Sequence, residues 1–308
     1  MNRALAGGYS APVDFNNEGR ASDIQDRRGQ GGGGGAKAGL GLGGMVIVGI
    51  IALLLRRNPV EVINTVNQQQ ARSQRQLPRG GGGSPGPRNE AERQAEVLVR
   101  RATTDIQDYW QSALPQMTGG RAQYQRTQLV LFADETTSGC GAAEAATGPF
   151  FCPADRLVYI DLAFYAELAQ RFRAPGDFAQ AYVLAHEFGH YVQYLLGIEQ
   201  SVRRAQRMNR ANENALNVQL ELQADCFAGV WGASAAQRGM LRAGDVEEGL
   251  TAAAAIGDDR IQRMAGRRVS PERFTHGSSA QRVQWFRQGM SAGNITACDT
   301  FGNGTLRP

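Results

Sequence analysis

The sequence predicts a mostly helical α+β domain with a small antiparallel sheet, preceded by one transmembrane helix. Three observations predict this fold class: an uncharged run that ends at Leu55, two short segments rich in strand formers, and apolar residues at helical spacing through most of the chain beyond Gly176. The 39 glycines, many of them clustered, indicate that part of the 308 residues builds no core.

The uncharged run covers residues 38–55 and has about the minimum length of a membrane helix. Arg56 and Arg57 follow it, where a cleaved secretory signal would have small residues, so an uncleaved anchor is expected. A buried core helix is the alternative, which the glycine-rich flanks disfavour. Arginines on the two sides balance, so charge gives no orientation.

This anchor divides the chain into four expected parts. They are a disordered cytoplasmic tail at residues 1–37, a transmembrane helix at 38–55, a stalk or linker at 56–88 and a folded domain at 89–308. The tail is polar with mixed charge, and the stalk ends in a cluster of proline and glycine.

Within the folded domain, a first amphipathic helix is expected to begin at Asn89 or Glu90 and to stop at Pro115 to Gly119. Residues 127–132 and 157–162 are predicted strands and antiparallel neighbours. The remaining pattern predicts helices at residues 177–196, 204–236, 245–264 and 278–290.

All four cysteines lie beyond the expected anchor, at Cys140, Cys152, Cys226 and Cys298. Of the three possible pairings we favour Cys140 with Cys152, closing a short glycine-rich loop, and Cys226 with Cys298, tying the C-terminal tail to a helix. Disulfides would place the domain in an oxidising compartment. The alternative is four buried free thiols in a cytosolic domain.

The formal net charge of +4 comes from arginines scattered along the chain. Pairs such as Arg267 and Arg268 lack the interleaved aromatic residues of a strand-binding groove. The sequence therefore predicts no nucleic-acid partner.

The strongest chemical signal is the segment His186-Glu187-Phe188-Gly189-His190 inside a predicted apolar helix. Residues four apart share a helix face, so His186 and His190 can direct ring nitrogens at one zinc ion with Glu187 beside them. Burying these groups without a metal or a hydrogen-bond network would be costly. A chance HExxH match on a surface helix is the alternative, although two of only three histidines lie in the motif.

A catalytic zinc site needs a third protein ligand, and Glu221 on the next predicted helix is the candidate. Asp225 lies one helical turn further along the same face, where its carboxylate could accept the free ring N–H of a ligating histidine. The competing acids lack a second acid four residues on among apolar neighbours; they are Glu213, Glu247 and Glu248.

Several further motifs accompany the HExxH segment. They are SDIQDRRG at 22–29, SGCG at 138–141, CPAD at 152–155, ELQADCFAGVW at 221–231, GDD at 257–259 and FTHGSS at 274–279. With these motifs the chain resembles the bacterial putative neutral zinc metallopeptidase family, of the gluzincin type with a zincin-like domain. The resemblance implies Glu221 as third zinc ligand and Asp225 as the acid that supports a ligating histidine. It also implies a bacterial inner-membrane protein with its peptidase domain outside the cytoplasm.

The expected function is that of a membrane-anchored zinc metallopeptidase that hydrolyses peptide bonds through a zinc-activated water. Glu187 would act as general base, and His276 is the candidate donor to the developing oxyanion. His276 could equally have a local structural role, and Tyr191 or Tyr194 could replace it. The expected partners are a protein or peptide substrate and the membrane; the oligomeric state cannot be predicted.

Two other functions are compatible with the same residues. A membrane-tethered scaffold could retain the zinc fold without cleaving anything, although such a protein would be expected to lose Glu187 first. A zinc hydrolase acting on other bonds is the third reading. For an extended peptide, the edge of Leu129–Phe132 or of Leu157–Asp161 is the candidate docking strand.

Overall fold

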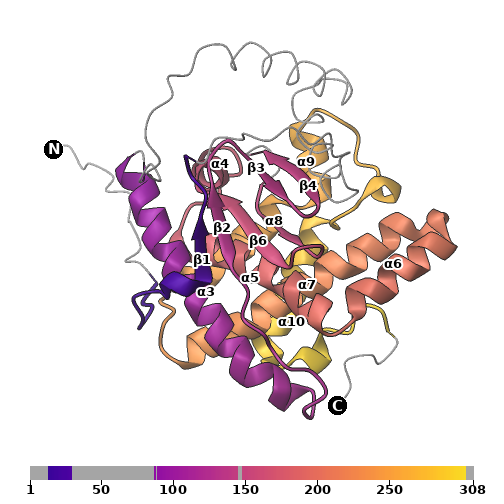
Figure 1. The fold of residues 1–308 in the computed structure, drawn as a ribbon. Coiled ribbons are helices and arrows are strands. Elements are labelled where there is room, and N and C mark those ends of the chain that lie inside the picture. The colour runs from indigo at the N-terminus through magenta and orange to yellow at the C-terminus, as the bar shows by residue number, and fades with distance from the viewer. Residues whose placement is uncertain (1–12, 30–86, 88, 145–147, 303–308) are drawn as a thin grey trace.

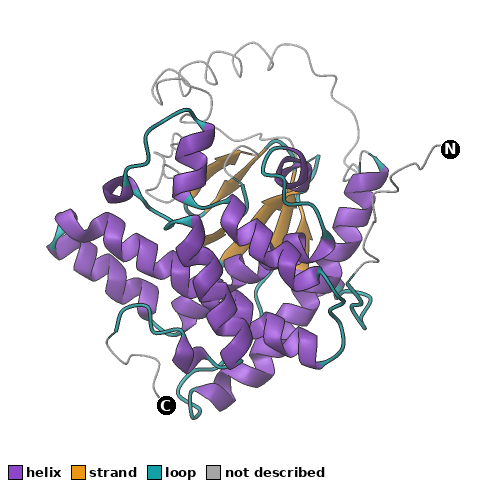
Figure 2. Ribbon diagram, turned by 180° about the vertical axis from the view of Figure 1, so that it is seen from behind, coloured by secondary structure: helices purple, strands orange, loops and turns teal. Residues whose placement is uncertain are grey.

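The computed structural model describes residues 13–29, 87, 89–144 and 148–302 and forms a mostly helical α+β domain. A small sheet covers one side of a helical body, as the opposite views of Figures 1 and 2 show. The strands are β1 (Ile24–Asp26), β2 (Leu129–Phe132), β3 (Glu135–Ser138), β4 (Gly141–Glu144), β5 (Phe150–Cys152) and β6 (Leu157–Asp161). The α-helices are α3 (Glu90–Met117), α4 (Ala163–Gln170), α5 (Asp177–Leu195), α6 (Ile198–Met208), α7 (Glu213–Gln237), α8 (Asp245–Ala255), α9 (Asp258–Met264) and α10 (Ser279–Ala292).

The main sheet is mixed, with strand order β1-β2-β6-β5. β2 pairs in parallel with both β1 and β6, and only β5 pairs with β6 in antiparallel fashion. The prediction that residues 127–132 and 157–162 are antiparallel neighbours is therefore wrong. The connecting residues 133–156 are long enough for the crossover that a parallel pair needs, and they contain the separate hairpin β3–β4. All four residues of β2 are buried, as is typical of a central parallel strand.

Residues 13–29 belong to this folded domain. Ile24 pairs with Leu129, and Val13 and Phe15 are buried in the main core. The buried carboxylate of Asp23 accepts two hydrogen bonds from Arg126, which lies just before β2. The expectation of a disordered tail is therefore wrong for these residues.

The expected single-pass anchor must also be corrected. No helix among the described residues combines the length and apolar character needed to cross a bilayer, and the expected span at 38–55 lies outside those residues. Residues 13–29 were expected on the opposite side of a membrane from 89–308, yet β1 and β2 are hydrogen-bonded neighbours. The predicted inner-membrane topology, with only the C-terminal part outside the cytoplasm, conflicts with this pairing.

The helix boundaries follow local capping signals where these are present. The Asn89 side chain accepts the N–H of Glu92 at the start of α3, and Ser278 with Gln281 forms a capping box at the start of α10. The predicted helix 204–236 is interrupted, because α6 ends at Met208 and α7 begins at Glu213. The predicted helix 245–264 is likewise divided into α8 and α9 at Gly257.

Helices α5, α7 and α10 form the centre of the helical body. α7 and α10 approach closely because glycines face backbone: a Cβ at Gly289 would collide with the carbonyl oxygen of Cys226, and one at Gly229 with that of Phe286. The favoured disulfides are both formed, between Cys140 and Cys152 and between Cys226 and Cys298. The second disulfide fixes the C-terminal segment against α7.

Candidate metal centre

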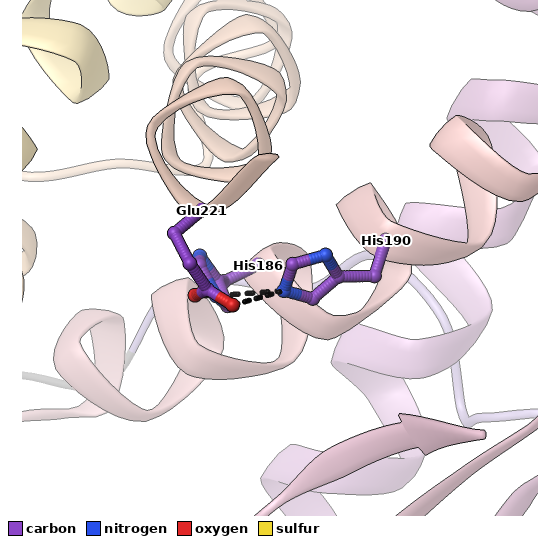
Figure 3. Close-up of side chains that lie close together, drawn as sticks. All are labelled: His186, His190 and Glu221. Atoms are coloured by element: carbon purple, nitrogen blue, oxygen red, sulfur yellow. Dashed lines mark hydrogen bonds and ion pairs between the residues drawn. The ribbon is translucent and has the colours of Figure 1, made fainter. Parts of the chain in front are cut away.

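Two helices bring three potential metal ligands together. His186 and His190 lie on one face of α5, and Glu221 projects toward them from α7 (Figure 3). Their ligand atoms all lie within 4.8 Å of one another. Nε2 of His186 is 3.2 Å from Nε2 of His190 and 3.2 Å from Oε2 of Glu221, while Nε2 of His190 is 3.6 Å from Oε1 of Glu221.

These separations fit a tetrahedral zinc ion. Zinc bonds to nitrogen and oxygen of about 2.0–2.1 Å at tetrahedral angles place neighbouring ligand atoms roughly 3.3–3.4 Å apart. The Nδ1 atom of His186 faces Asp225 at 2.9 Å, and the Nδ1 atom of His190 faces the amide oxygen of Gln193 at 2.9 Å. If both Nδ1 atoms carry the proton, both Nε2 lone pairs point at the same centre, an arrangement that a cation relieves.

The orientation of Gln193 follows from its other hydrogen bonds. Its amide nitrogen donates to the Leu220 carbonyl oxygen at 2.8 Å and to the side-chain oxygen of Gln223 at 3.0 Å. Gln223 in turn donates to the carbonyl oxygen of Cys298 at 3.0 Å. The amide oxygen of Gln193 therefore faces His190, and the chain of hydrogen bonds leads back to the disulfide-bonded C-terminal segment.

Asp225 is fully buried and accepts hydrogen bonds from three directions. Tyr182 donates its hydroxyl, and Arg282 donates from Nε and from one terminal nitrogen, each at 2.8 Å, in addition to the contact with His186. Burial alone would raise the pKa of Asp225, but the charges of Arg282 and His186 outweigh it and lower the pKa. Asp225 is therefore held as a carboxylate behind His186.

The cluster is electrostatically prepared for positive charge. Burial acts to lower the pKa of His186, but Asp225 and Glu221 outweigh it and raise the pKa to about 10. Burial would raise the pKa of Glu221, yet the charges of His276 and His190 lower it well below its usual range. The carboxylate of Glu221 is thus ionised and available as a ligand.

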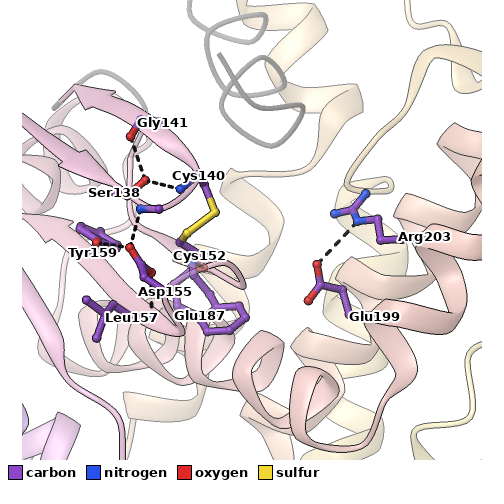
Figure 4. Close-up of a disulfide and its surroundings, with 12 residues drawn as sticks. Ser138, Cys140, Gly141, Cys152, Asp155, Leu157, Tyr159, Glu187, Glu199 and Arg203 are labelled. Atoms are coloured by element: carbon purple, nitrogen blue, oxygen red, sulfur yellow. Dashed lines mark hydrogen bonds and ion pairs between the residues drawn. A yellow bond between two sulfur atoms is a disulfide. The ribbon is translucent and has the colours of Figure 1, made fainter. Parts of the chain in front are cut away.

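Glu187 lies on the same helix and faces the edge of the sheet. Its Oε2 accepts the backbone N–H of Phe151 at 2.9 Å, and only 8% of the residue is exposed. Burial raises the pKa of Glu187, while His186 and His190 oppose this rise. Cys152 follows Phe151 in β5, so the Cys140–Cys152 disulfide lies close to Glu187, as Figure 4 shows.

His276 is held in the loop between α9 and α10 by Asp258. One oxygen of Asp258 accepts the backbone N–H groups of Thr275, His276 and Gly277, at 2.7, 2.6 and 3.1 Å. The other lies 3.5 Å from Nδ1 of His276. Burial would lower the pKa of His276, but the charges of Glu221 and Asp258 raise it.

The other candidate residues have different contacts. The hydroxyl of Tyr191 donates to the Gln125 carbonyl oxygen at 2.8 Å, and the ring of Tyr194 packs against Phe151. Glu248 accepts the N–H of Phe178 at the start of α5. Among the described residues, the cluster of possible metal ligands contains none of Glu213, Glu247 and Glu248.

Five supporting residues were not predicted from the sequence: Phe151, Tyr182, Gln193, Asp258 and Arg282. Only Arg282 had a clear local signal, since it shares the buried face of α10 with Phe286 and Gly289, and a charge on an apolar face requires a partner. Gln193 lies three residues after His190 on α5, but its orientation depends on α7, and the other three residues act through contacts between distant segments.

The fold and the cluster define a helical α+β protein with a candidate metal centre built on an HExxH helix. A family model described as "putative neutral zinc metallopeptidase" matches residues 13–301, and the chain belongs to this family. The match includes β1, consistent with a domain to which this strand belongs.

Relatives carry no further functional description in their names. The chain is 45% identical over 290 residues to "Uncharacterized protein YpfJ" of Escherichia coli (strain K12), covering 92% of this chain and 97% of that protein. It is 39% identical over 223 residues to "Uncharacterized protein Rv2575" of Mycobacterium tuberculosis (strain ATCC 25618 / H37Rv), covering 69% and 72%. A search of the solved structures returned no match.

Proposed function

We propose that this protein is a zinc-dependent peptidase of the gluzincin type. The observation that carries the proposal is the convergence of His186, His190 and Glu221 within 4.8 Å, with Glu187 on the same helix. These three residues would hold the ion, and Asp225 would orient His186. A bound zinc ion would supply a Lewis acid that acidifies water and stabilises negative charge on a carbonyl oxygen.

Glu187 has the properties of a general base at such a centre. Its buried carboxylate has a raised pKa, which favours accepting a proton near neutral pH and passing it on to a leaving amine. The N–H of Phe151 holds one carboxylate oxygen, leaving the other to take the proton. His276, raised in pKa, would donate a hydrogen bond to the developing oxyanion.

The edge strand β5 supports the choice of an extended peptide as substrate. The N–H of Val158 in β6 donates to the carbonyl oxygen of Gln128, just before β2, so the backbone groups of Val158 point away from β5. Phe151 lies directly opposite Val158 in an antiparallel pair, and its backbone groups therefore point away from β6. The free edge thus offers the Phe151 carbonyl oxygen to a peptide N–H beside Glu187. β2 and β6, the strands expected from the sequence, are both interior to the sheet.

The test compares the full-length protein with its Glu187→Gln variant. Both are expected to bind one zinc ion, because Glu187 holds no metal. Cleavage of a diverse peptide library should fall by at least a factor of about 10²–10⁴ in the variant. If both proteins bind zinc and neither cleaves any peptide, the scaffold function is favoured; if esters or other non-peptide substrates are cleaved instead, the chain is a different zinc hydrolase.

A further inference from the structure

Six exposed arginines lie in two neighbouring segments, one of which leads into α7 while the other forms the loop that holds His276. These segments are the hairpin tip at residues 203–214, where α6 leads into α7, and the loop at residues 265–277 between α9 and α10. Figures 1 and 2 both place these segments next to each other, and the side chain of Asn214 donates to the Glu272 carbonyl oxygen at 3.2 Å. The arginine wall comprises the exposed residues Arg204, Arg207, Arg210, Arg267, Arg268 and Arg273.

The charge of this wall is not neutralised by its surroundings. Arg203 pairs with Glu199, and Arg263 pairs with Asp259. The arginines of the wall, in contrast, form no ion pair with any residue that the structure describes, and the same two segments contain only two acids, Glu213 and Glu272. A surface with this excess of guanidinium groups attracts an anionic partner.

Helix α7 connects the arginine wall with the candidate centre. Glu221 lies seven residues after Asn214 and so on the same face, about 10 Å along the helix axis. The loop follows this face, because Gly277 packs against Leu222 and Val218 of α7. An extended peptide advances about 3.3 Å per residue, so a chain leaving the centre along α7 reaches the wall after roughly three to five residues.

We propose that the arginine wall binds acidic side chains of a peptide substrate, roughly three to five residues from the cleaved bond. This inference rests on the proposed peptidase function. Guanidinium groups pair with carboxylates through two parallel hydrogen bonds, which suits them to select Asp and Glu. The single aromatic residue of the two segments, Phe274, is buried, so the wall lacks the stacking platform of a single-stranded nucleic-acid site.

The first test measures binding without cleavage. Zinc-loaded, full-length Glu187→Gln protein is titrated against fluorescent peptides of about twelve residues with glutamates in both outer thirds, and against the same peptides with glutamines. The glutamate peptide is expected to bind about tenfold tighter, with an advantage that shrinks as salt is raised. Equal affinity for the two peptides would overturn the inference.

Charge reversal then locates the interaction. The paired variants Arg207→Glu with Arg210→Glu, and Arg267→Glu with Arg268→Glu, should each lose most of the tenfold advantage and bind a lysine-containing peptide better. These side chains are exposed, so the variants are expected to fold. The matched control reverses Arg242 and Arg287, which are exposed on other surfaces, and should bind the peptides as the parent does.

The outcomes separate this inference from the function on which it rests. Tight binding of the glutamate peptide through the wall, with no cleavage of any peptide by the protein with Glu187 intact, would contradict the peptidase function and support the acidic-peptide site. An equal loss of binding in the control pair would overturn the inference, since net charge would then explain it. So would binding of anionic phospholipid vesicles through these arginines without preference for the glutamate peptide.

Discussion

The candidate centre has a helix side, with His186 and His190 on α5, and a loop side, with His276 between α9 and α10. The two sides hold their histidines in different ways. His186 and His190 are fixed by the spacing of one helix, and each Nδ1 atom meets a side-chain oxygen that other buried groups hold in place. His276 lies in a loop where the carboxylate of Asp258 accepts three backbone N–H groups, and the hydroxyl of Thr275 lies 2.9 Å from Nδ1 of the ring. Under the proposed function, the helix side would bind the metal and the loop side would contact the substrate.

The largest effect is expected from removing a candidate metal ligand on the helix side. Glu221→Ala removes one of three ligand groups and should abolish both stoichiometric zinc binding and peptide cleavage, because a zinc site requires its protein ligands. Its loss of affinity should exceed the roughly 10–100-fold change typical of an outer partner. Zinc content after dialysis and competition with a chromogenic chelator measure the effect. Glu213→Ala, eight residues earlier on the same helix, is the matched control; equal zinc retention in the two variants would refute the ligand assignment.

The next effect separates the loop side from the metal. His276→Ala should lower kcat by a factor of about 10²–10³, the usual effect of losing an oxyanion donor, and leave zinc affinity unchanged. Asp258→Ala should reproduce this loss, because Asp258 positions the loop. The double variant should be little worse than either single one, since both remove the same interaction. Additive losses, or loss of zinc from His276→Ala, would contradict this division.

The same division explains what the sequence could predict. The spacing of His186 and His190 reports a shared face because a helix has a fixed period, and Glu221 with Asp225 repeats that logic on α7. A loop has no such period, so the tie between Asp258 and His276 was not predicted, although both residues lie in short polar motifs. Contacts such as that of Phe151 with Glu187 require knowing which strand lies at the sheet edge.

The predictions of strand direction and of the N-terminal segment were wrong because they, too, depend on contacts between distant parts of the chain. Residues 127–132 and 157–162 have the composition of strands, but composition does not distinguish a parallel from an antiparallel pair. The segment at 22–29 is polar, and its strand β1 is stabilised by a partner about 100 residues away, since Ile24 pairs with Leu129. A short strand whose stability comes from such distant contacts leaves little local signal.

The smallest expected effect concerns Arg282, which lies behind the helix side and contacts it through Asp225. Arg282 is 2% exposed and binds both oxygens of Asp225, so its loss leaves a buried carboxylate short of its main partner and less able to orient His186. Arg282→Met should weaken zinc binding about 10–100-fold and destabilise the fold by about 3–5 kcal/mol, as expected when a buried ion pair loses one member. Arg282→Lys should recover part of the affinity, because it restores the charge but not the paired hydrogen bonds.

The control for Arg282 is another buried arginine that does not contact the centre. Arg28, on the N-terminal segment, pairs with Asp26 at 2.6 Å and with Glu96 of α3 at 2.9 Å. Arg28→Met should lower the free energy of unfolding by a similar amount, measured by denaturant titration, yet leave the zinc affinity of the folded protein unchanged. If chelator competition gives the same zinc affinity for Arg282→Met and Arg28→Met, then Arg282 only stabilises the fold. Unequal affinity at equal stability would instead assign Arg282 to the orientation of His186 through Asp225.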